Sequence, residues 1–121
     1  MGIRNAGNTA PNKFLLENDN KILEINSPQE NVGGTYIVVH KDLSDRWAIV
    51  ALDWDGKPHL GIRWFWGSGG NPISTGFAVW FVLPTSLSRN MLSGLPLTHE
   101  FSAKIDDFLA GKITGTELRQ L

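Results

Sequence analysis

The chain has 121 residues, of which 41% are hydrophobic and 19% charged, so it is long and apolar enough to bury a core, which excludes a disordered chain. Its net charge of -1 excludes attraction of nucleic acid by overall charge, so a nucleic-acid site requires a local basic patch. It contains no cysteine, which excludes disulfides, thiolate zinc sites and a cysteine nucleophile. We expect a single domain over residues 1–121.

The chain begins with a polar, asparagine-rich segment that lacks the apolar stretch of a signal peptide. We interpret residues 1–12 as a loose lead-in. The longest apolar stretches elsewhere have the length of strands and fall short of the ~20 residues that a membrane-spanning helix needs. The sequence therefore predicts a cytoplasmic protein without a membrane partner.

Residues 13–83 carry the patterns of antiparallel strands. The first pattern predicts a small hairpin, because residues 14–16 and 21–25 flank Asn18-Asp19-Asn20, residue types that tolerate positive φ. Residues 27–34 contain Pro28 and a Gly-Gly pair and predict a loop.

Four longer strands are expected after this loop, because β-branched and aromatic residues recur there between turn signals. They are predicted over residues 36–39, 46–54, 57–66 and 77–83. Asp55-Gly56 is the residue pair that a tight type I′ turn demands, so residues 46–66 predict a hairpin. Residues 67–72 are rich in glycine and predict a flexible loop.

Residues 85–121 predict three short helices. Thr85 or Ser86, Thr98 and Thr114 are suitable N-caps, and Thr114 forms a capping-box pattern with Glu117. Glycines at 94 and 111 end the first two helices. Strands first and helices last indicate an α+β fold. We therefore expect a curved antiparallel sheet of about four to six strands, followed by C-terminal helices.

No motif predicts catalysis, a metal site or a cofactor. Asp53-Trp54-Asp55-Gly56 lacks the later ligands of a calcium loop and is typical of a hairpin turn. Residues 67–70 lack the Gly-Lys-Ser/Thr ending of a phosphate-binding loop, which favours a mobile loop between strands. His40, His59 and His99 have no ligand spacing. We predict no catalytic residue, no metal ligand and no cofactor.

Residues 56–99 combine aromatic rings with cations and contain no Asp or Glu. Period-2 alternation places large rings on both faces of the predicted strands, so the second face requires a cover. One interpretation is a homodimer whose partner covers that face, since a chain of this size has too few helices to cover both. The other is a platform on which bases or a small ligand stack. The candidate binding residues are Lys57, Arg63, Trp64, Trp66 and Trp80.

Residues 46–92 resemble the transcriptional positive cofactor family of single-stranded DNA-binding proteins. The resemblance is carried by Trp54-Asp55-Gly56-Lys57-Pro58 and Gly61-Ile62-Arg63-Trp64, a turn followed by an Ile-Arg-aromatic step. It implies a curved four-stranded antiparallel sheet that dimerises through its helices. It also implies phosphate contacts from Lys57 and Arg63 and base stacking on Trp64. In general character the chain is also similar to small orphan proteins of bacterial integron gene cassettes.

These features predict a non-enzymatic binding protein, with a single-stranded nucleic-acid-binding homodimer as the first hypothesis. The alternatives are a protein that binds a small aromatic or cationic ligand in a Trp-rich pocket and a protein-interaction module.

Overall fold

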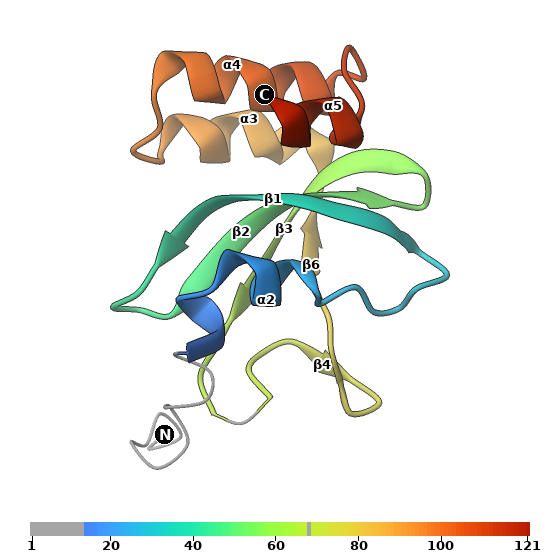
Figure 1. The fold of residues 1–121 in the computed structure, drawn as a ribbon, viewed down its shortest axis with the longest axis vertical. Helices are drawn as coiled ribbons and strands as arrows, with labels where there is room; N and C mark the ends of the chain where they lie inside the picture. The colour runs from blue at the N-terminus through green and yellow to red at the C-terminus, as the bar shows by residue number, and fades with distance from the viewer. Residues whose placement is uncertain (1–13, 68) are drawn as a thin grey trace.

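The computed structural model describes residues 14–67 and 69–121, and the lead-in predicted over residues 1–12 lies outside them. The fold is α+β, with antiparallel strands followed by helices (Figure 1). The helices are α2 (Asp19–Leu23), α3 (Thr85–Ser93), α4 (His99–Leu109) and α5 (Gly115–Gln120). The strands are β1 (Val32–Asp42), β2 (Trp47–Trp54), β3 (Lys57–Trp64), β4 (Ile73–Ser74), β5 (Phe77–Ala78) and β6 (Phe81–Leu83). The predicted fold class is confirmed.

The main sheet contains four antiparallel strands in the order β1-β2-β3-β6, and β4 and β5 pair as a separate small hairpin. The β2–β3 hairpin pairs without a register shift from Trp47 opposite Trp64 to Trp54 opposite Lys57. Its turn residue Asp55 has φ 51°. The next residue, Gly56, has φ 77°. Positive φ at both positions is what a type I′ turn needs, so the predicted turn is confirmed.

Both faces of the main sheet are buried beneath other elements of the same chain. Residues 48–52 of β2 are at most 1% exposed, so this central strand is covered on both sides. On one face Ile49 packs in a cluster with Phe108 of α4. On the other face Val50 packs in a cluster with Leu16 and Ile22. Helices α3 to α5 and helix α2 therefore lie on opposite sides of the sheet (Figure 1).

The cover of the second face is helical, so the predicted hairpin over residues 14–25 is wrong. Residues 14–16 are helical and α2 follows them. Asn18 caps α2, because its side chain accepts a hydrogen bond from the Lys21 N–H at 3.3 Å. Asparagine suits both positive-φ turns and helix N-caps. The helical form allows Leu16 and Ile22 to be fully buried against the sheet.

The strand predicted over residues 77–83 is interrupted between Ala78 and Phe81. Side-chain hydrogen bonds engage the two residues of the break. The Val79 carbonyl accepts from Arg63 at 2.7 Å, and the Trp80 indole N–H donates to the Ile25 carbonyl at 2.7 Å. These contacts turn residues 79 and 80 inward, which a period-2 pattern does not show.

The C-terminal helices begin and end close to the predicted residues. The Thr98 hydroxyl accepts from the Phe101 N–H at 3.1 Å, and Thr114 and Glu117 form a complete capping box. Gly111 follows α4 with φ 77°. Helix α3 begins with Pro84 as its N-cap, so the prediction of Thr85 or Ser86 at that position is wrong.

The partial cover of the second face narrows the argument on which the homodimer was predicted. That argument required a partner subunit over the second aromatic face. Leu16 and Ile22 of this chain cover that face instead, and both are 0% exposed. Phe77 and Phe81 remain 63% and 59% exposed, so part of the aromatic surface has no cover within the chain, and the homodimer stays a prediction.

Candidate ligand-binding groove

Arg63, predicted to contact phosphate, is buried in the interior and is 1% exposed. Its guanidinium donates from Nη1 to the Pro72 carbonyl at 3.1 Å and to the Val79 carbonyl at 2.7 Å. Its Nη2 donates to the Gly69 carbonyl at 2.6 Å. Pro72 and Val79 are the two residues that flank the β4–β5 hairpin. The hydrogen bonds of Arg63 therefore connect both ends of this hairpin to the main sheet.

The burial of Arg63 decides what its charge can do. Burial lowers the pKa of Arg63 to about 10, so the side chain remains a cation at neutral pH. The residue at position 70 must be small, because a Cβ on Gly70 would overlap the Arg63 Nη2. Within the loop predicted to be flexible over residues 67–72, the carbonyls of Gly69 and Pro72 accept from this guanidinium. With three carbonyls as its partners, Arg63 is a positioning residue and not a surface phosphate ligand.

Trp80 belongs to the core of the second face. It is 4% exposed, and its indole N–H is engaged by the Ile25 carbonyl. The opposing residue on β3 must be glycine, because a Cβ on Gly61 would lie 3.0 Å from Trp80 Cβ and 2.7 Å from Leu52 Cδ2. Because Trp80 is only 4% exposed, it is no open stacking platform.

The remaining candidates do not share one surface. Trp64 is half-buried and lies opposite Trp47 at one end of the β2–β3 hairpin. Trp66 donates its indole N–H to the Asp45 carbonyl at 3.1 Å, and the Arg46 guanidinium lies 4.9 Å from its ring centroid. Lys57 is exposed at the opposite end of β3, roughly 23 Å from Trp64 at the usual rise per residue. The structure does not bring the five predicted binding residues together.

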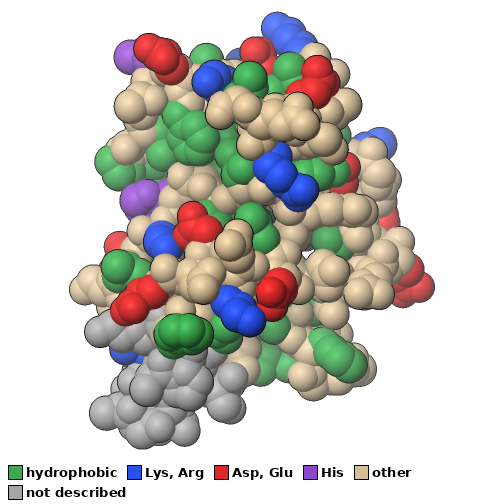
Figure 2. Space-filling view, viewed as in Figure 1, with side chains coloured by type: hydrophobic (Ala, Val, Ile, Leu, Met, Phe, Trp, Pro, Cys, Tyr) green, Lys and Arg blue, Asp and Glu red, His purple; other side chains and the backbone are tan. Residues whose placement is uncertain are grey.

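The surface charge is also distributed. On the face shown in Figure 2, acidic and basic side chains alternate and form no single basic patch. Lys41 forms an ion pair with Asp19 at 2.8 Å, which neutralises one of the cations of the chain. Single-stranded nucleic acid stays a prediction, and the candidate residues do not form the combination of cation and ring that it was based on.

A groove of about 600 Å³ lies where the second face of the sheet meets the β4–β5 hairpin. Aromatic and aliphatic side chains make most of its wall. They include Trp54, His59, Ile73, Trp80, Phe81 and Pro84. None of the lining residues is Asp, Glu, Lys or Arg. The side chains of Phe81 and Ile73 are 59% and 51% exposed. This aromatic groove is wide and open to solvent, and its lining is as apolar as that of small-ligand sites.

Sequence reasoning included Trp80 in the binding set but missed Trp54, His59 and Phe81. Trp54 lies on the same face of β2 as Leu52 and Val50, since alternate residues share a face, and all three belong to the second cluster. This alternation in the sequence could have placed Trp54 on the second face of the sheet. The position of Phe81 depends on the break in the strand after Ala78, for which the sequence gives no local signal.

Two polar groups of the aromatic groove are available to a ligand. The His59 Nδ1 lies 2.9 Å from the Lys57 carbonyl, which only accepts, so Nδ1 carries the proton and Nε2 of the neutral ring is an acceptor. In the described ranges 14–67 and 69–121, neither His59 Nε2 nor the Trp54 indole N–H has a hydrogen-bond partner. Within the same ranges Arg63 Nε is the one buried side-chain polar atom without a partner, so the Trp54 N–H is reached by solvent. With the exposed Ser74 hydroxyl, these groups are the polar side-chain groups left for a ligand in an otherwise apolar, uncharged wall.

A metal site and a membrane-spanning helix each have requirements that the described part of the chain does not meet. There, no group of three His, Asp or Glu side chains is placed to hold a metal ion. None of the helices that the structure describes is long and apolar enough to cross a membrane. No protein-family model matches the chain, and comparisons with curated proteins and with solved structures gave no match.

Proposed function

We propose that this protein binds a small, neutral aromatic ligand in the aromatic groove and does not transform it. The observation that carries the proposal is the pairing of an indole donor on Trp54 and an imidazole acceptor on His59 inside an uncharged aromatic wall. A polar group in an apolar site is tolerated only when it is hydrogen-bonded. A ligand that hydrogen-bonds to both groups therefore binds with a more favourable free energy than its buried apolar area alone provides.

The absence of charge in the groove wall defines the ligand class. A charged ligand would lose part of its hydration and meet no opposite charge there, which is costly. A neutral ring that carries an amide satisfies both polar groups, since an amide has a carbonyl acceptor and N–H donors. Benzamide is the simplest probe with this chemistry. Benzoate and benzamidinium have nearly the same shape with one negative and one positive charge.

The expected affinity follows from ligand size. Benzamide has about nine non-hydrogen atoms, and at roughly 0.3–0.5 kcal/mol per atom its dissociation constant is about millimolar. The natural ligand is larger, because the volume of about 600 Å³ exceeds what one ring fills. Ring stacking on Trp54 and Phe81 supplies the additional contact area in this proposal.

The test is a titration of the full chain with each of the three probes, in which ligand-detected NMR measures binding. Benzamide is expected to bind at least about tenfold more tightly than benzoate or benzamidinium. Trp54→Phe removes the donor but keeps a ring, and we expect it to weaken benzamide about threefold to tenfold. Trp66→Phe is the matched control and leaves the affinity unchanged. Equal binding of all three probes, or equal effects of the two variants, contradicts the proposal.

A further inference from the structure

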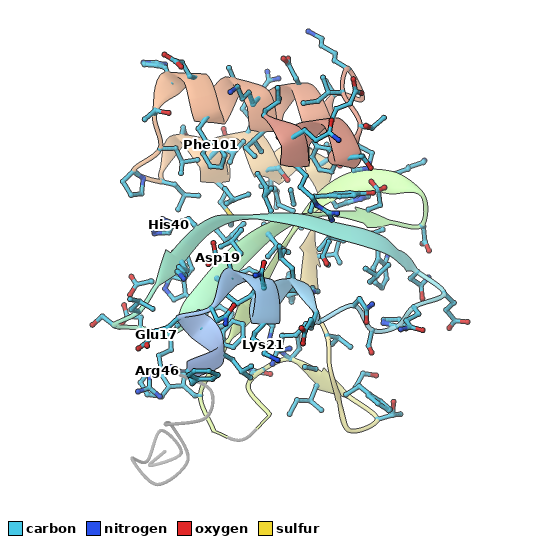
Figure 3. The ribbon with its side chains drawn as sticks, viewed as in Figure 1. Glu17, Asp19, Lys21, His40, Arg46 and Phe101 are labelled. Carbon is cyan, nitrogen blue, oxygen red and sulfur yellow. The ribbon has the colours of Figure 1, made fainter. Side chains whose placement is uncertain are left out.

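A second groove, of about 320 Å³, lies on the opposite edge of the main sheet. Its floor is the edge strand β1, with α2 on one side and α4 and α5 on the other. Figure 3 shows Phe101 of α4 above β1 and Asp19 of α2 below it. Leu23, Ile37, Phe101 and Leu118 give this edge groove an apolar lining. It is separate from the aromatic groove, with which it shares no residue.

The edge of β1 is not open to another strand. The pairing of β1 with β2 shifts register at three places, and such bulges protect an edge from further pairing. The Arg119 side chain also donates to two β1 carbonyls, from Nη2 to Thr35 at 2.7 Å and from Nε to Tyr36 at 3.3 Å. An added β-strand is therefore excluded as the occupant, and a small ligand is favoured.

The edge groove is lined by two cations and one acid. Asp19 is the one acid that lines the groove, and its carboxylate is paired with Lys41 at 2.8 Å. Lys104 and Arg119 also line it. Over residues 14–67 and 69–121, Lys104 has no ion pair and no hydrogen bond, and Arg119 has no carboxylate partner. Lys104 and Arg119 thus line a largely apolar groove without forming an ion pair over the described residues.

Arg119 and Lys104 both have N–H groups that are free to donate hydrogen bonds to a ligand. A guanidinium has five N–H groups, and Arg119 directs two of them, on Nε and Nη2, to the β1 carbonyls. The Arg119 guanidinium also lies 5.3 Å from the centroid of the Tyr36 ring, which fixes its position over β1. The half-buried Lys104 side chain can lay its methylene stem along the apolar wall while its ammonium reaches the rim.

From this charge complementarity we infer that the edge groove binds an amphiphilic anion. The carboxylate or other anionic head lies between Lys104 and Arg119, and a compact apolar tail lies between Ile37, Phe101 and Leu118. The volume of about 320 Å³ is near the lower limit for ligand sites, so a short chain or a single ring fits. This site does not depend on the aromatic groove.

The inference is tested on the full chain with octanoate and two probes of the same length, octanamide and octylammonium. Octanoate is expected to bind about tenfold more tightly than octanamide, and octylammonium more weakly still. Lys104→Met keeps the apolar stem and removes the charge, so it is expected to weaken octanoate about tenfold and to leave octanamide unchanged. Leu121→Asp places a carboxylate at the 64% exposed rim residue and is expected to weaken octanoate further.

Lys112→Met is the matched control, because it removes the same charge from an exposed position between α4 and α5. It leaves octanoate binding unchanged if the site is specific. Trp54→Phe also leaves it unchanged, because Trp54 belongs to the other groove. Equal binding of octanoate and octanamide overturns the inference, as do equal effects of Lys104→Met and Lys112→Met. Displacement of octanoate by benzamide shows that the ligand occupies the aromatic groove and also overturns it.

Discussion

Replacement of Arg63 by Met tests whether this buried cation holds the outer wall of the aromatic groove. The change removes three hydrogen bonds, to the carbonyls of Gly69, Pro72 and Val79. Bonds that involve a charged group contribute about 1.5–3 kcal/mol each, so their sum is roughly 4.5–9 kcal/mol. Burial of the cation opposes this sum by several kcal/mol.

The Nε of Arg63 has no hydrogen-bond partner, and a buried donor without a partner costs about 1–3 kcal/mol. This cost adds to the unfavourable free energy of burying the cation. We therefore expect Arg63→Met to lower the free energy of unfolding by about 2–4 kcal/mol. A domain of this size has roughly 5–15 kcal/mol in total, so the variant remains folded and measurable.

Urea denaturation followed by circular dichroism measures this difference, and limited proteolysis locates it. The β4–β5 hairpin has two residues in each strand and is too short to be stable alone. We expect new cleavage within residues 72–79 of the variant. Arg89→Met is the matched control, because Arg89 is 78% exposed and its ion pair with Asp106 spans 3.7 Å; its effect should stay below about 0.5 kcal/mol. If both variants unfold at the urea concentration of the wild type, Arg63 does not hold the hairpin.

Three further predictions concern the helical side of the sheet. Phe108→Ala removes a ring that is 1% exposed and meets the Tyr36 ring edge-on at a centroid distance of 5.7 Å. We expect urea denaturation to show a loss of about 3–5 kcal/mol in the free energy of unfolding. An unchanged midpoint would show that α4 is dispensable. Gly115→Ala places a Cβ where the Tyr36 ring lies, so it should destabilise by about 1–3 kcal/mol, whereas the exposed control Gly94→Ala should not. Burial, followed by the hydrogen bond to Asp53, raises the pKa of Tyr36 to about 12. The folded state holds this proton more tightly, so the contribution of Tyr36 to stability is present below pH 10 and lost as the pH rises through 12. Tyr36 is the chain's one tyrosine, so the ultraviolet absorbance of its phenolate reports it alone; a midpoint at pH 10.0 would contradict the contact with Asp53.

The features that the sequence predicts correctly are those that depend on neighbouring residues. Asp55-Gly56 needs only its own backbone preferences to form a type I′ turn. Thr98 and Thr114 cap their helices through N–H groups three residues away. The same local chemistry is ambiguous at Asn18, which suits a turn and a helix cap equally, and burial of Ile22 against the distant sheet decides between them.

The role of Arg63 is not predictable from its neighbours. Arginine is mostly exposed in proteins, so a cation beside aromatic residues suggests a surface contact. Its actual partners are carbonyls that follow it by 6, 9 and 16 residues, in loops that carry no pattern for accepting a guanidinium. The aromatic groove depends on the same contacts, because they connect Pro72 and Val79, which line the groove, to Arg63 of the main sheet.

Assignment of the five indole N–H signals by NMR, followed by addition of benzamide, tests the proposed ligand site most directly. The indole N–H groups of Trp66 and Trp80 already donate to the carbonyls of Asp45 and Ile25. Trp54 lines the aromatic groove, and its indole N–H has no hydrogen-bond partner among the described residues. We predict that the Trp54 signal moves most, with a smaller shift at Trp80 and none at Trp66. A shift confined to Trp64 or Trp66, or no shift at millimolar benzamide, would contradict the aromatic groove as the binding site.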